Sequence, residues 1–358
     1  MKARVIIGAN CGDESKGTIV ARYTRDSENV LNVLTNGGAQ RGHSILTKDG
    51  NITYKHFGSG TYFGADSYYS RYFILNPVQF AKEHKDMIVK PKKFYRDPIC
   101  RWTTIYDMFA NLISEHMQHR HASCCMGIWN TVRRSMDQMP PLFDAFMYFT
   151  HAQKREYLKK VKEYYEKEMV IPDEYKKVWD DPALMDHFIE DCWYMYRNTE
   201  VIQLKDLKYD NLIFENGQGL LLSDTGADIY DTTPSNTGIK YSLDLLSEFA
   251  PGTVESVTAH YVSRTYLTRH GDGYLDGESS RKFISSDIKE DRTNQYNEFQ
   301  GGFRYGVIAD VNDIYDRVKK DAGNVNFELE LTHCDEFDNV NEFKRRFDVV
   351  HTYDTALV

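Results

Sequence analysis

The chain has 358 residues, enough for one large α/β domain or two smaller ones, and this length excludes a small disulfide-stapled scaffold. Its 44 lysine and arginine residues and 53 aspartate and glutamate residues leave a net charge of −9, the wrong sign for tight non-specific binding to nucleic acid or to an anionic membrane. The six scattered cysteines form no CxxC pair and no zinc-like set with histidines, and no apolar run is long enough to span a bilayer. We therefore expect a cytoplasmic protein that binds neither nucleic acid nor membrane.

Residues 1–40 show one pattern twice. A short β-branched run ends at Gly8, and a helix is predicted to open near Ser15. A second strand is predicted at 30–34 and ends at two glycines, Gly37 and Gly38. Strands that alternate with helices indicate a mainly parallel sheet, whose ligands bind beyond the carboxyl ends of the strands. We therefore expect the chemistry in the loops that follow these strands.

The middle of the chain has a helical pattern. Apolar residues between Tyr157 and Met169 recur at helical spacing, with lysine and glutamate on the opposite face. Strand signals return at 212–214, 254–262 and 327–331, and there is no internal repeat or low-complexity linker. We expect one α/β domain over 1–358, with a mainly parallel β-sheet flanked by helices and a helical insertion at about 143–200.

The strongest local signal is the segment Gly8-Ala-Asn-Cys-Gly-Asp-Glu-Ser-Lys-Gly17. Glycines between a strand and a helix let backbone N–H groups approach an anion, and the helix dipole and Lys16 add positive charge. The segment is not the common phosphate loop, which would need glycine before Lys16 and serine or threonine after it. Asp13 would be repelled by bound phosphate unless a cation bridges them or the carboxylate acts as a base, so it predicts Mg²⁺, proton abstraction or both.

Two further polar loops follow strands of the same predicted sheet. In Asn36-Gly-Gly-Ala-Gln-Arg-Gly-His-Ser44, His43 is a candidate proton donor and the Gly42 carbonyl a candidate metal ligand. In Phe214-Glu-Asn-Gly-Gln-Gly219, the Gln218 amide carries the donor and acceptor that a purine edge requires. Thr233, in the polar stretch that follows, suits a phosphate.

In this order, the motifs resemble the adenylosuccinate synthetase family. Its members carry G-x-x-x-G-D-E-G-K-G, G-G-x-N-A-G-H-T, F-E-G-A-Q-G and L-T-K-L-D, where this chain has GANCGDESKG, GGAQRGHS, FENGQG and LTHCD. The resemblance spans nearly the whole chain. It implies a ligase in which GTP phosphorylates the 6-oxygen of a purine nucleotide and the amine of L-aspartate then displaces that phosphate.

The resemblance also implies catalytic roles. Asp13 would remove the purine N1 proton, His43 would stabilise the oxygen charge and help phosphate leave, and Lys16 would neutralise the transferring phosphoryl group. Mg²⁺ would be held by Asp13 and Gly42. The triphosphate would contact Gly12, Glu14, Ser15, Lys16, Gly17, Thr18, Gly42, His43 and Ser44.

Further binding roles follow from the same resemblance. The purine monophosphate would contact Asp13, Gln40, Ser123, Arg134, Gln218 and Thr233. The donor base would contact His333 and Asp335, and aspartate would contact Gly301, Gly302 and Arg304. We expect a homodimer. For the family's arginine that reaches the nucleotide of the partner subunit, this chain offers the pair Arg133-Arg134, and the resemblance leaves open which arginine takes that role.

Departures from the family pattern bear on the substrates. Gln40 replaces the asparagine that faces the purine, Ser15 replaces a glycine, and His333 replaces the lysine of L-T-K-L-D. A short chain with an altered purine contact resembles the bacteriophage branch, which joins aspartate to dGMP toward 2-aminoadenine nucleotides in the host cytoplasm. Enzymes of the bacteriophage branch often lack the catalytic aspartate, whereas this chain has Asp13.

Several alternatives remain open at this stage. The leading acceptor is dGMP, with IMP as the alternative, and the donor is GTP, ATP or dATP. A nucleotide kinase or NTPase would account for the first loop, but it gives no reason for His43 and Gln218.

Overall fold

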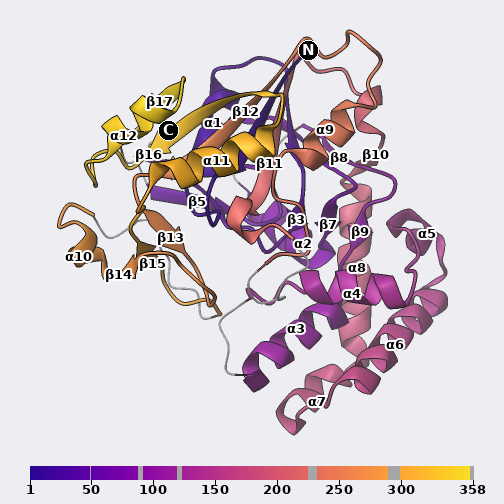
Figure 1. Ribbon diagram of the computed structural model, residues 1–358. Helices are drawn as coiled ribbons and strands as arrows, with labels where there is room; N and C mark the ends of the chain where they lie inside the picture. The colour runs from indigo at the N-terminus through magenta and orange to yellow at the C-terminus, as the bar shows by residue number, and fades with distance from the viewer. Residues whose placement is uncertain (49, 88–91, 119–122, 225–231, 289–298, 355–358) are drawn as a thin grey trace.

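The computed structural model describes residues 1–48, 50–87, 92–118, 123–224, 232–288 and 299–354. A nine-stranded sheet runs through it (Figure 1), and every pairing in that sheet is parallel. The strand order is β10 (Glu200–Val201), β8 (Phe94–Arg96), β6 (Asp66–Tyr69), β2 (Val30–Leu34), β11 (Asn211–Gly219), β1 (Lys2–Gly8), β12 (Ser256–Arg264), β16 (Asn326–Thr332) and β17 (Val350–Thr352). The predicted α/β fold with a mainly parallel sheet is confirmed.

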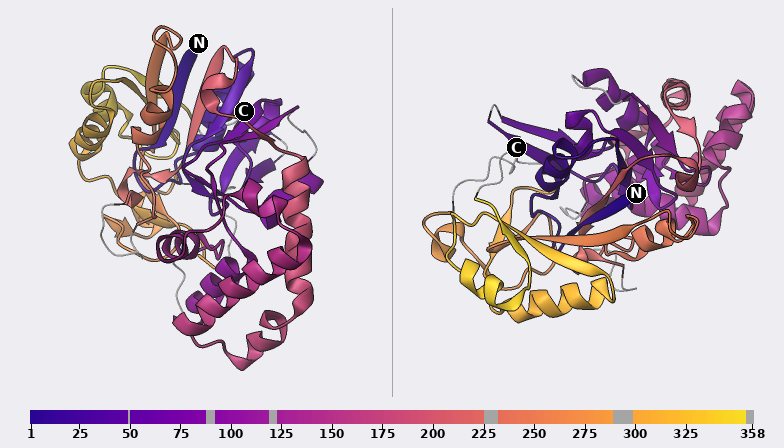
Figure 2. Two further views of the ribbon diagram at one scale, coloured as in Figure 1. Left: turned by 90° about the vertical axis from the view of Figure 1, so that its right-hand side faces the viewer. Right: turned by 90° about the horizontal axis from the view of Figure 1, so that it is seen from above.

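Helices cover both faces of this sheet, as Figure 2 shows. The flanking helices are α1 (Lys16–Arg25), α2 (Pro77–Asp86), α9 (Lys240–Leu246), α11 (Val311–Ala322) and α12 (Val340–Arg346). Successive residues of a strand point to opposite faces. Ile6 of β1 accordingly packs with Ile19 of α1, whereas Val5 and Ile7 pack with apolar residues of α9 and α11. Burial on both faces explains the nearly continuous apolar runs of β1 and β2.

The helical region is larger than the sequence pattern predicts. It contains α3 (Ile105–Gln118), α4 (Ile128–Asp137), α5 (Phe143–Tyr148), α6 (His151–Glu168), α7 (Asp173–Trp179) and α8 (Pro182–Arg197). These helices gather at one end of the molecule (Figures 1 and 2). The region begins at Ile105 rather than at residue 143. A buried ion pair between Asp107 of α3 and Arg134 of α4 interrupts the apolar face that hydropathy detects.

Smaller strand groups surround the carboxyl ends of the main sheet. They are the hairpin β4 (His43–Thr47) and β5 (Gly50–Tyr54), the group β3 (Gly37–Gly38), β7 (Phe73–Leu75) and β9 (Arg101–Trp102), and the group β13 (Leu267–Arg269), β15 (Arg304–Gly306) and β14 (Glu278–Ser279). The helix α10 (Arg281–Ile284) follows β14. Within the described ranges, no helix combines the length and apolar character that a bilayer crossing requires.

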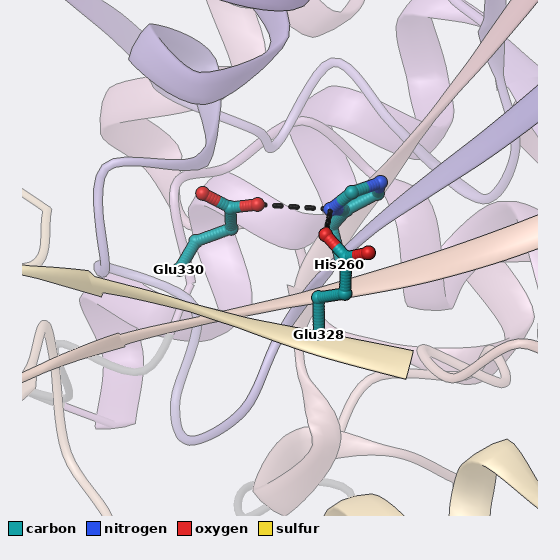
Figure 3. A group of neighbouring side chains, drawn as sticks. All are labelled: His260, Glu328 and Glu330. Atoms are coloured by element: carbon teal, nitrogen blue, oxygen red, sulfur yellow. Dashed lines mark hydrogen bonds and ion pairs between the residues drawn. The ribbon is translucent and has the colours of Figure 1, made fainter. Parts of the chain in front are cut away.

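A histidine and two glutamates meet on the sheet where α1 crosses it (Figure 3). His260 Nδ1 lies 2.8 Å from a carboxylate oxygen of Glu330 and 3.6 Å from one of Glu328. The hydroxyls of Tyr23 and Tyr353 each donate to Glu330 at 2.7 Å. The Glu330 oxygens therefore already have hydrogen-bond donors, and we interpret the group as a polar network that fixes α1 to the sheet.

Candidate active site

Three loops meet at the carboxyl ends of the adjacent strands β1, β2 and β11. Parallel neighbours bring their C-terminal loops to one edge, so the segments that follow Gly8 and Leu34 lie beside Gln218. A cleft opens between the first two loops and the segments that follow β12 and precede β15. The cleft is lined by Gly12, Asp13, Ser15, Lys16, Gly17, Gly42, His43, Ser44, Arg264, His270 and Phe303.

The first loop is a tight backbone turn that requires glycine. Gly12 has a φ of +109°, and a Cβ on it would lie 2.7 Å from the Cα atom of Gln218. A Cβ on Gly17 would lie 2.6 Å from the carbonyl oxygen of Ser44. Ser15 caps α1 in the left-handed region with φ +74°, where a glycine would be unstrained. The backbone of the first loop therefore packs against the third loop at Gln218 and against the second loop at Ser44.

Lys16 is held inside the first loop by Glu14. The Glu14 carboxylate accepts hydrogen bonds from the N–H groups of Asn10 at 3.1 Å and Gly12 at 2.7 Å, and it lies 3.5 Å from Lys16 Nζ. Lys16 Nζ also donates to the Gly12 carbonyl. Burial raises the pKa of Glu14 above its ordinary value. Glu14 thus shapes the anion cradle from behind the cleft.

Seven of the nine residues predicted to bind the triphosphate line the cleft, and Glu14 and Thr18 lie behind it. The Thr18 hydroxyl accepts a hydrogen bond from the N–H of Leu46 at 3.3 Å, which ties α1 to β4. Backbone N–H groups at a helix N-terminus, together with a lysine, are the parts that grip a phosphate chain. The cleft can therefore hold a polyphosphate.

Asp13 faces the cleft as an ionised carboxylate. Burial alone would raise its pKa, but His270, Lys16 and Arg264 outweigh this effect and lower it. Its carboxylate lies 3.3 Å from His270 Nδ1, and its backbone carbonyl accepts a hydrogen bond from Arg264 Nε at 2.7 Å. Gly42 lines the same cleft from the second loop. A carboxylate and a backbone carbonyl are oxygen ligands that Mg²⁺ prefers, so the predicted ligand pair fits this cation.

His43 and Glu215 form a buried pair at the rear of the cleft. His43 Nδ1 hydrogen-bonds the Glu215 carboxylate, which also accepts from the N–H and hydroxyl of Ser59 at 2.8 and 2.6 Å. Burial lowers the pKa of His43 to about 4. The pKa of Glu215 is about 2, because His43, Arg41 and Ser59 outweigh the effect of burial. At neutral pH, a neutral His43 therefore donates its Nδ1 hydrogen to Glu215.

The side-chain amides of Gln40 and Gln218 converge beside Gly37. A Cβ on Gly37 would lie 3.3 Å from Gln40 Nε2 and 3.5 Å from Gln218 Oε1. Both amide oxygens are buried and have no hydrogen-bond partner among the described residues. Buried polar atoms are normally paired, so two such oxygens together indicate a polar ligand. Gln218 is held there with a φ of +57°.

The segments of two further residues predicted to bind the acceptor, Ser123 and Thr233, approach the second loop. The segment of Ser123 approaches the second loop, because Cys124 Sγ lies 3.6 Å from the Gln40 carbonyl oxygen. The Ser123 hydroxyl donates to Asn111 Oδ1 at 3.0 Å. The segment of Thr233 approaches the same loop from the other side, since Asn36 donates to the Ser235 hydroxyl at 3.1 Å.

The structure does not bring Arg134 into the site. Its Nε and Nη2 atoms donate to the two Asp107 oxygens at 2.7 and 2.8 Å, and Nη1 donates to the Tyr157 hydroxyl at 3.1 Å. Arg134 is 1% exposed. Its guanidinium thus joins two helices, and this placement departs from the predicted contact with a nucleotide phosphate.

The residues predicted to bind the donor base lie next to the first loop. The Thr332 hydroxyl donates to the carbonyl of Glu14 at 3.2 Å and hydrogen-bonds His333 Nδ1 at 3.0 Å. His333 is buried with a φ of +57°, and Asp335 is exposed. Strand β16 therefore brings the LTHCD segment against the first loop.

Arg304, predicted to bind aspartate, already has three partners. Its guanidinium pairs with Glu278 and donates to the carbonyls of Gly271 at 2.9 Å and Gly273 at 2.8 Å. It therefore fixes the segment of Gly301 and Gly302 to the loop after β13. An amino-acid carboxylate would have to compete with Glu278 for this side chain.

Sequence reasoning missed two residues that contact predicted catalytic groups. Glu215 lies within FENGQG, so its motif was the available signal. His270 follows β13 in a stretch without a recognised motif, and only the fold places it beside Asp13.

Comparison with known proteins identifies the family. The family profile of adenylosuccinate synthetase matches residues 5–302, most of the chain, so the protein belongs to the adenylosuccinate synthetase family. Curated protein sequences provide no match. The structure is similar to fully ligated adenylosuccinate synthetase from Plasmodium falciparum, with a TM-score of 0.70 and 17% identity over 93% of this chain and 77% of that chain.

A phage enzyme has the same architecture. The succinoaminodeoxyadenylate synthetase (PurZ) of cyanophage S-2L, bound to dGMP and to dATP as an energy donor, matches with a TM-score of 0.64 and 12% identity. The match covers 98% of this chain and 91% of that chain. The resemblance predicted from four motifs is therefore confirmed at the level of family and fold.

Proposed function

We propose that the protein joins L-aspartate to C6 of dGMP, with hydrolysis of a nucleoside triphosphate, to give N6-succino-2-amino-2′-deoxyadenylate. The observation that carries this proposal is the pair of unpartnered amide oxygens of Gln40 and Gln218 beside the phosphate cleft. Gln40 is one methylene longer than the asparagine of the family motif. Its oxygen is a suitable acceptor for the 2-amino group that dGMP has and IMP lacks.

In the first step, Asp13 takes the proton from purine N1. The N1–H electron pair shifts through the ring to O6, which bonds to the γ-phosphorus as the nucleoside diphosphate leaves. His43 would donate from Nε2 to the reacting oxygens when it is protonated beside the anionic phosphates, and the Glu215 carboxylate at Nδ1 would balance the charge of the imidazolium. Lys16 and the N–H groups of its loop bind the phosphates. Mg²⁺ held by Asp13 and Gly42 would supply further charge neutralisation there.

In the second step, the aspartate amine attacks C6, loses a proton, and the 6-phosphate departs. The amino-acid subsite is proposed at Gly301, Gly302 and Arg304, and the donor base is proposed to lie against His333 and Asp335. A carboxylate at Asp335 can accept two hydrogen bonds from guanine but has no such pair on adenine, which favours GTP. Ser123 and Thr233 would hold the acceptor.

We further propose a cytoplasmic homodimer, since the family resemblance implies a dimer and nucleotide substrates are cytoplasmic. The arginine for the partner's nucleotide is proposed to come from the pair Arg133-Arg134. Arg134 would have to leave Asp107 to reach another subunit. Light scattering of the wild-type enzyme tests the dimer, and the acceptor affinity of Arg133→Ala and of Arg134→Lys, which keeps a charge beside Asp107, tests the contact with the nucleotide.

A substrate matrix tests the proposed function. Purified enzyme with Mg²⁺ and aspartate would be given dGMP, GMP or IMP with GTP, ATP or dATP, and products identified by mass spectrometry. We expect a succino-adduct of dGMP and phosphate release that requires aspartate. Equal turnover of IMP would leave an ordinary adenylosuccinate synthetase, and phosphate release without aspartate would favour an NTPase.

A further inference from the structure

His270 lies beside Asp13 in the cleft but has no place in the mechanism above. Its Nδ1 atom is 3.3 Å from the Asp13 carboxylate, and the two side chains are 22% and 27% exposed. Two other cations near Asp13 contact backbone carbonyls of the first loop: Lys16 donates to that of Gly12, and Arg264 Nε donates to that of Asp13. His270 contacts the carboxylate itself.

The imidazole of His270 is held in place from the far side of the cleft. Its ring centroid lies 4.0 Å from that of Phe303, with an interplanar angle of 47°. The guanidinium carbon of Arg264 lies 5.2 Å from the same Phe303 ring. Phe303 thus contacts both His270, which lies against the Asp13 carboxylate, and Arg264, which donates to the Asp13 backbone carbonyl.

The backbone next to His270 is tied to the segment proposed to bind aspartate. The N–H of Gly271 donates to the Gln300 carbonyl at 3.2 Å, and Arg304 donates to the carbonyls of Gly271 and Gly273 at 2.9 and 2.8 Å. The 300–304 segment and the loop of His270 therefore form one hydrogen-bonded unit. That unit reaches the first loop through the His270–Asp13 contact.

We infer that His270 is a positioning residue that holds the Asp13 carboxylate in its working orientation and couples it to the amino-acid segment. The role of Asp13 in this inference rests on the proposed function. A carboxylate on a flexible side chain loses efficiency when its rotamer is not fixed, and a misplacement of about 1 Å can lower a rate about 10²-fold. His270 acts through Asp13 and does not itself exchange a proton with substrate.

The kinetic test compares two substitutions of His270 with a remote control. His270→Ala removes the hydrogen bond to Asp13, whereas the carboxamide of His270→Asn still offers a short donor. We expect His270→Ala to lower kcat about 10- to 10²-fold at little-changed KM for the triphosphate, and His270→Asn to recover most of the loss. His187→Asn, at an exposed position of α8, should match the wild type. Equal kcat for His270→Ala and wild type would overturn the inference.

A double-mutant cycle with Asp13→Asn shows whether His270 works through Asp13. If it does, His270→Ala changes the residual rate of the Asp13→Asn enzyme by less than about threefold, because contacting residues that act as a unit are not additive. A full 10- to 10²-fold further loss would instead mean that His270 acts independently of Asp13.

A crystal structure of His270→Ala separates this inference from the proposed function. We expect the Asp13 side chain to change rotamer in His270→Ala and to keep its orientation in His270→Asn. If the wild type does not ligate but the rotamer moves, the proposed function fails and the positioning role stands. An Asp13 carboxylate unchanged in His270→Ala overturns the positioning role whatever the reaction.

Discussion

The His43 imidazole is oriented by Glu215, so a side chain of β4 takes its tautomer from a carboxylate of β11. The carboxylate in turn is fixed by the N–H and hydroxyl of Ser59. With Nδ1–H committed to Glu215, the other ring nitrogen is left for the cleft that His43 lines. The orientation of the His43 ring is therefore fixed by a residue of β11.

Replacement of Glu215 by glutamine should slow turnover by about 10²–10⁴-fold with substrate KM values little changed. The amide of Glu215→Gln can still hydrogen-bond the His43 ring, but it does not select the tautomer with hydrogen on Nδ1. It also cannot balance a positive charge on the imidazole, because it is neutral. Steady-state kinetics and melting temperature should be compared with Glu328→Gln, a partly exposed control on β16. Near-normal kcat in Glu215→Gln would exclude this role.

The Asp13→Ala variant should lose more than about 10³ in ligation rate, while acceptor binding stays within about tenfold. The carboxylate is proposed to act on the N1 proton and the cation, and not on the sugar phosphate. Single-turnover kinetics and calorimetric titration of the acceptor measure the two quantities. A variant that keeps a tenth of the rate would rule out the assigned role.

The Gln40→Asn variant should narrow the preference for dGMP over IMP, which we expect to be at least about tenfold in kcat/KM for the wild type. A site built around the 2-amino group leaves the Gln40 oxygen unpaired when IMP is bound, and the shorter asparagine no longer reaches it. Competition between the two acceptors, read by mass spectrometry, gives the ratio directly. An unchanged ratio would mean that Gln40 does not read the purine edge.

Arg134→Ala should destabilise the fold by about 3–5 kcal/mol, because it leaves the Asp107 carboxylate buried without its ion pair. Its neighbour Arg133 is 72% exposed and pairs with Glu168 at 3.2 Å, so Arg133→Ala should change stability by less than about 0.5 kcal/mol. Urea unfolding of the two variants compares them. Equal midpoints would contradict the buried-pair interpretation.

Stability should fall as pH rises through neutrality, in part because of Glu83. Burial raises the pKa of Glu83 to about 7, although N–H groups of Lys55, His56 and Phe57 oppose the shift. A carboxyl whose folded pKa is raised contributes stability that is full below its unfolded pKa of 4.5 and is lost as pH rises through 7. Melting temperatures from pH 4.5 to 8 should show a flatter dependence in Glu83→Gln than in wild type, and parallel curves would refute this.

The sequence predicted the strands and loops whose positions follow from local hydrophobic and glycine patterns. Parallel strands buried on both faces give β-branched runs that stop at glycines, so β1, β2 and the loops after them could be read directly. The start of the helical region was missed because its first two helices meet through Asp107 and Arg134. A buried ion pair looks, in sequence, like two surface charges.

The sequence predicted those parts of the candidate site in which a functional residue and the residues around it belong to one motif. Asp13 and His43 fall in the loops after β1 and β2, two strands of one parallel sheet that β11 separates, so both loops were expected at the same edge of the sheet. The contact of Asp13 with His270 could not be predicted, because it depends on how the loop after β13 folds back. The restraint of Arg304 by Glu278 likewise depends on the pairing of β14 with β15.

The close packing of Gly12 against Gln218 has a consequence for redesign of the enzyme. The loop proposed to bind the donor and the loop proposed to read the acceptor touch through main-chain atoms at Gly12 and Gln218. Under the proposed function, the distance between the transferred phosphorus and the receiving oxygen therefore depends on how these two loops pack. Selection for a new acceptor base should therefore succeed through changes at side chains such as Gln40, and insertions in either loop should disturb recognition of both nucleotides at once.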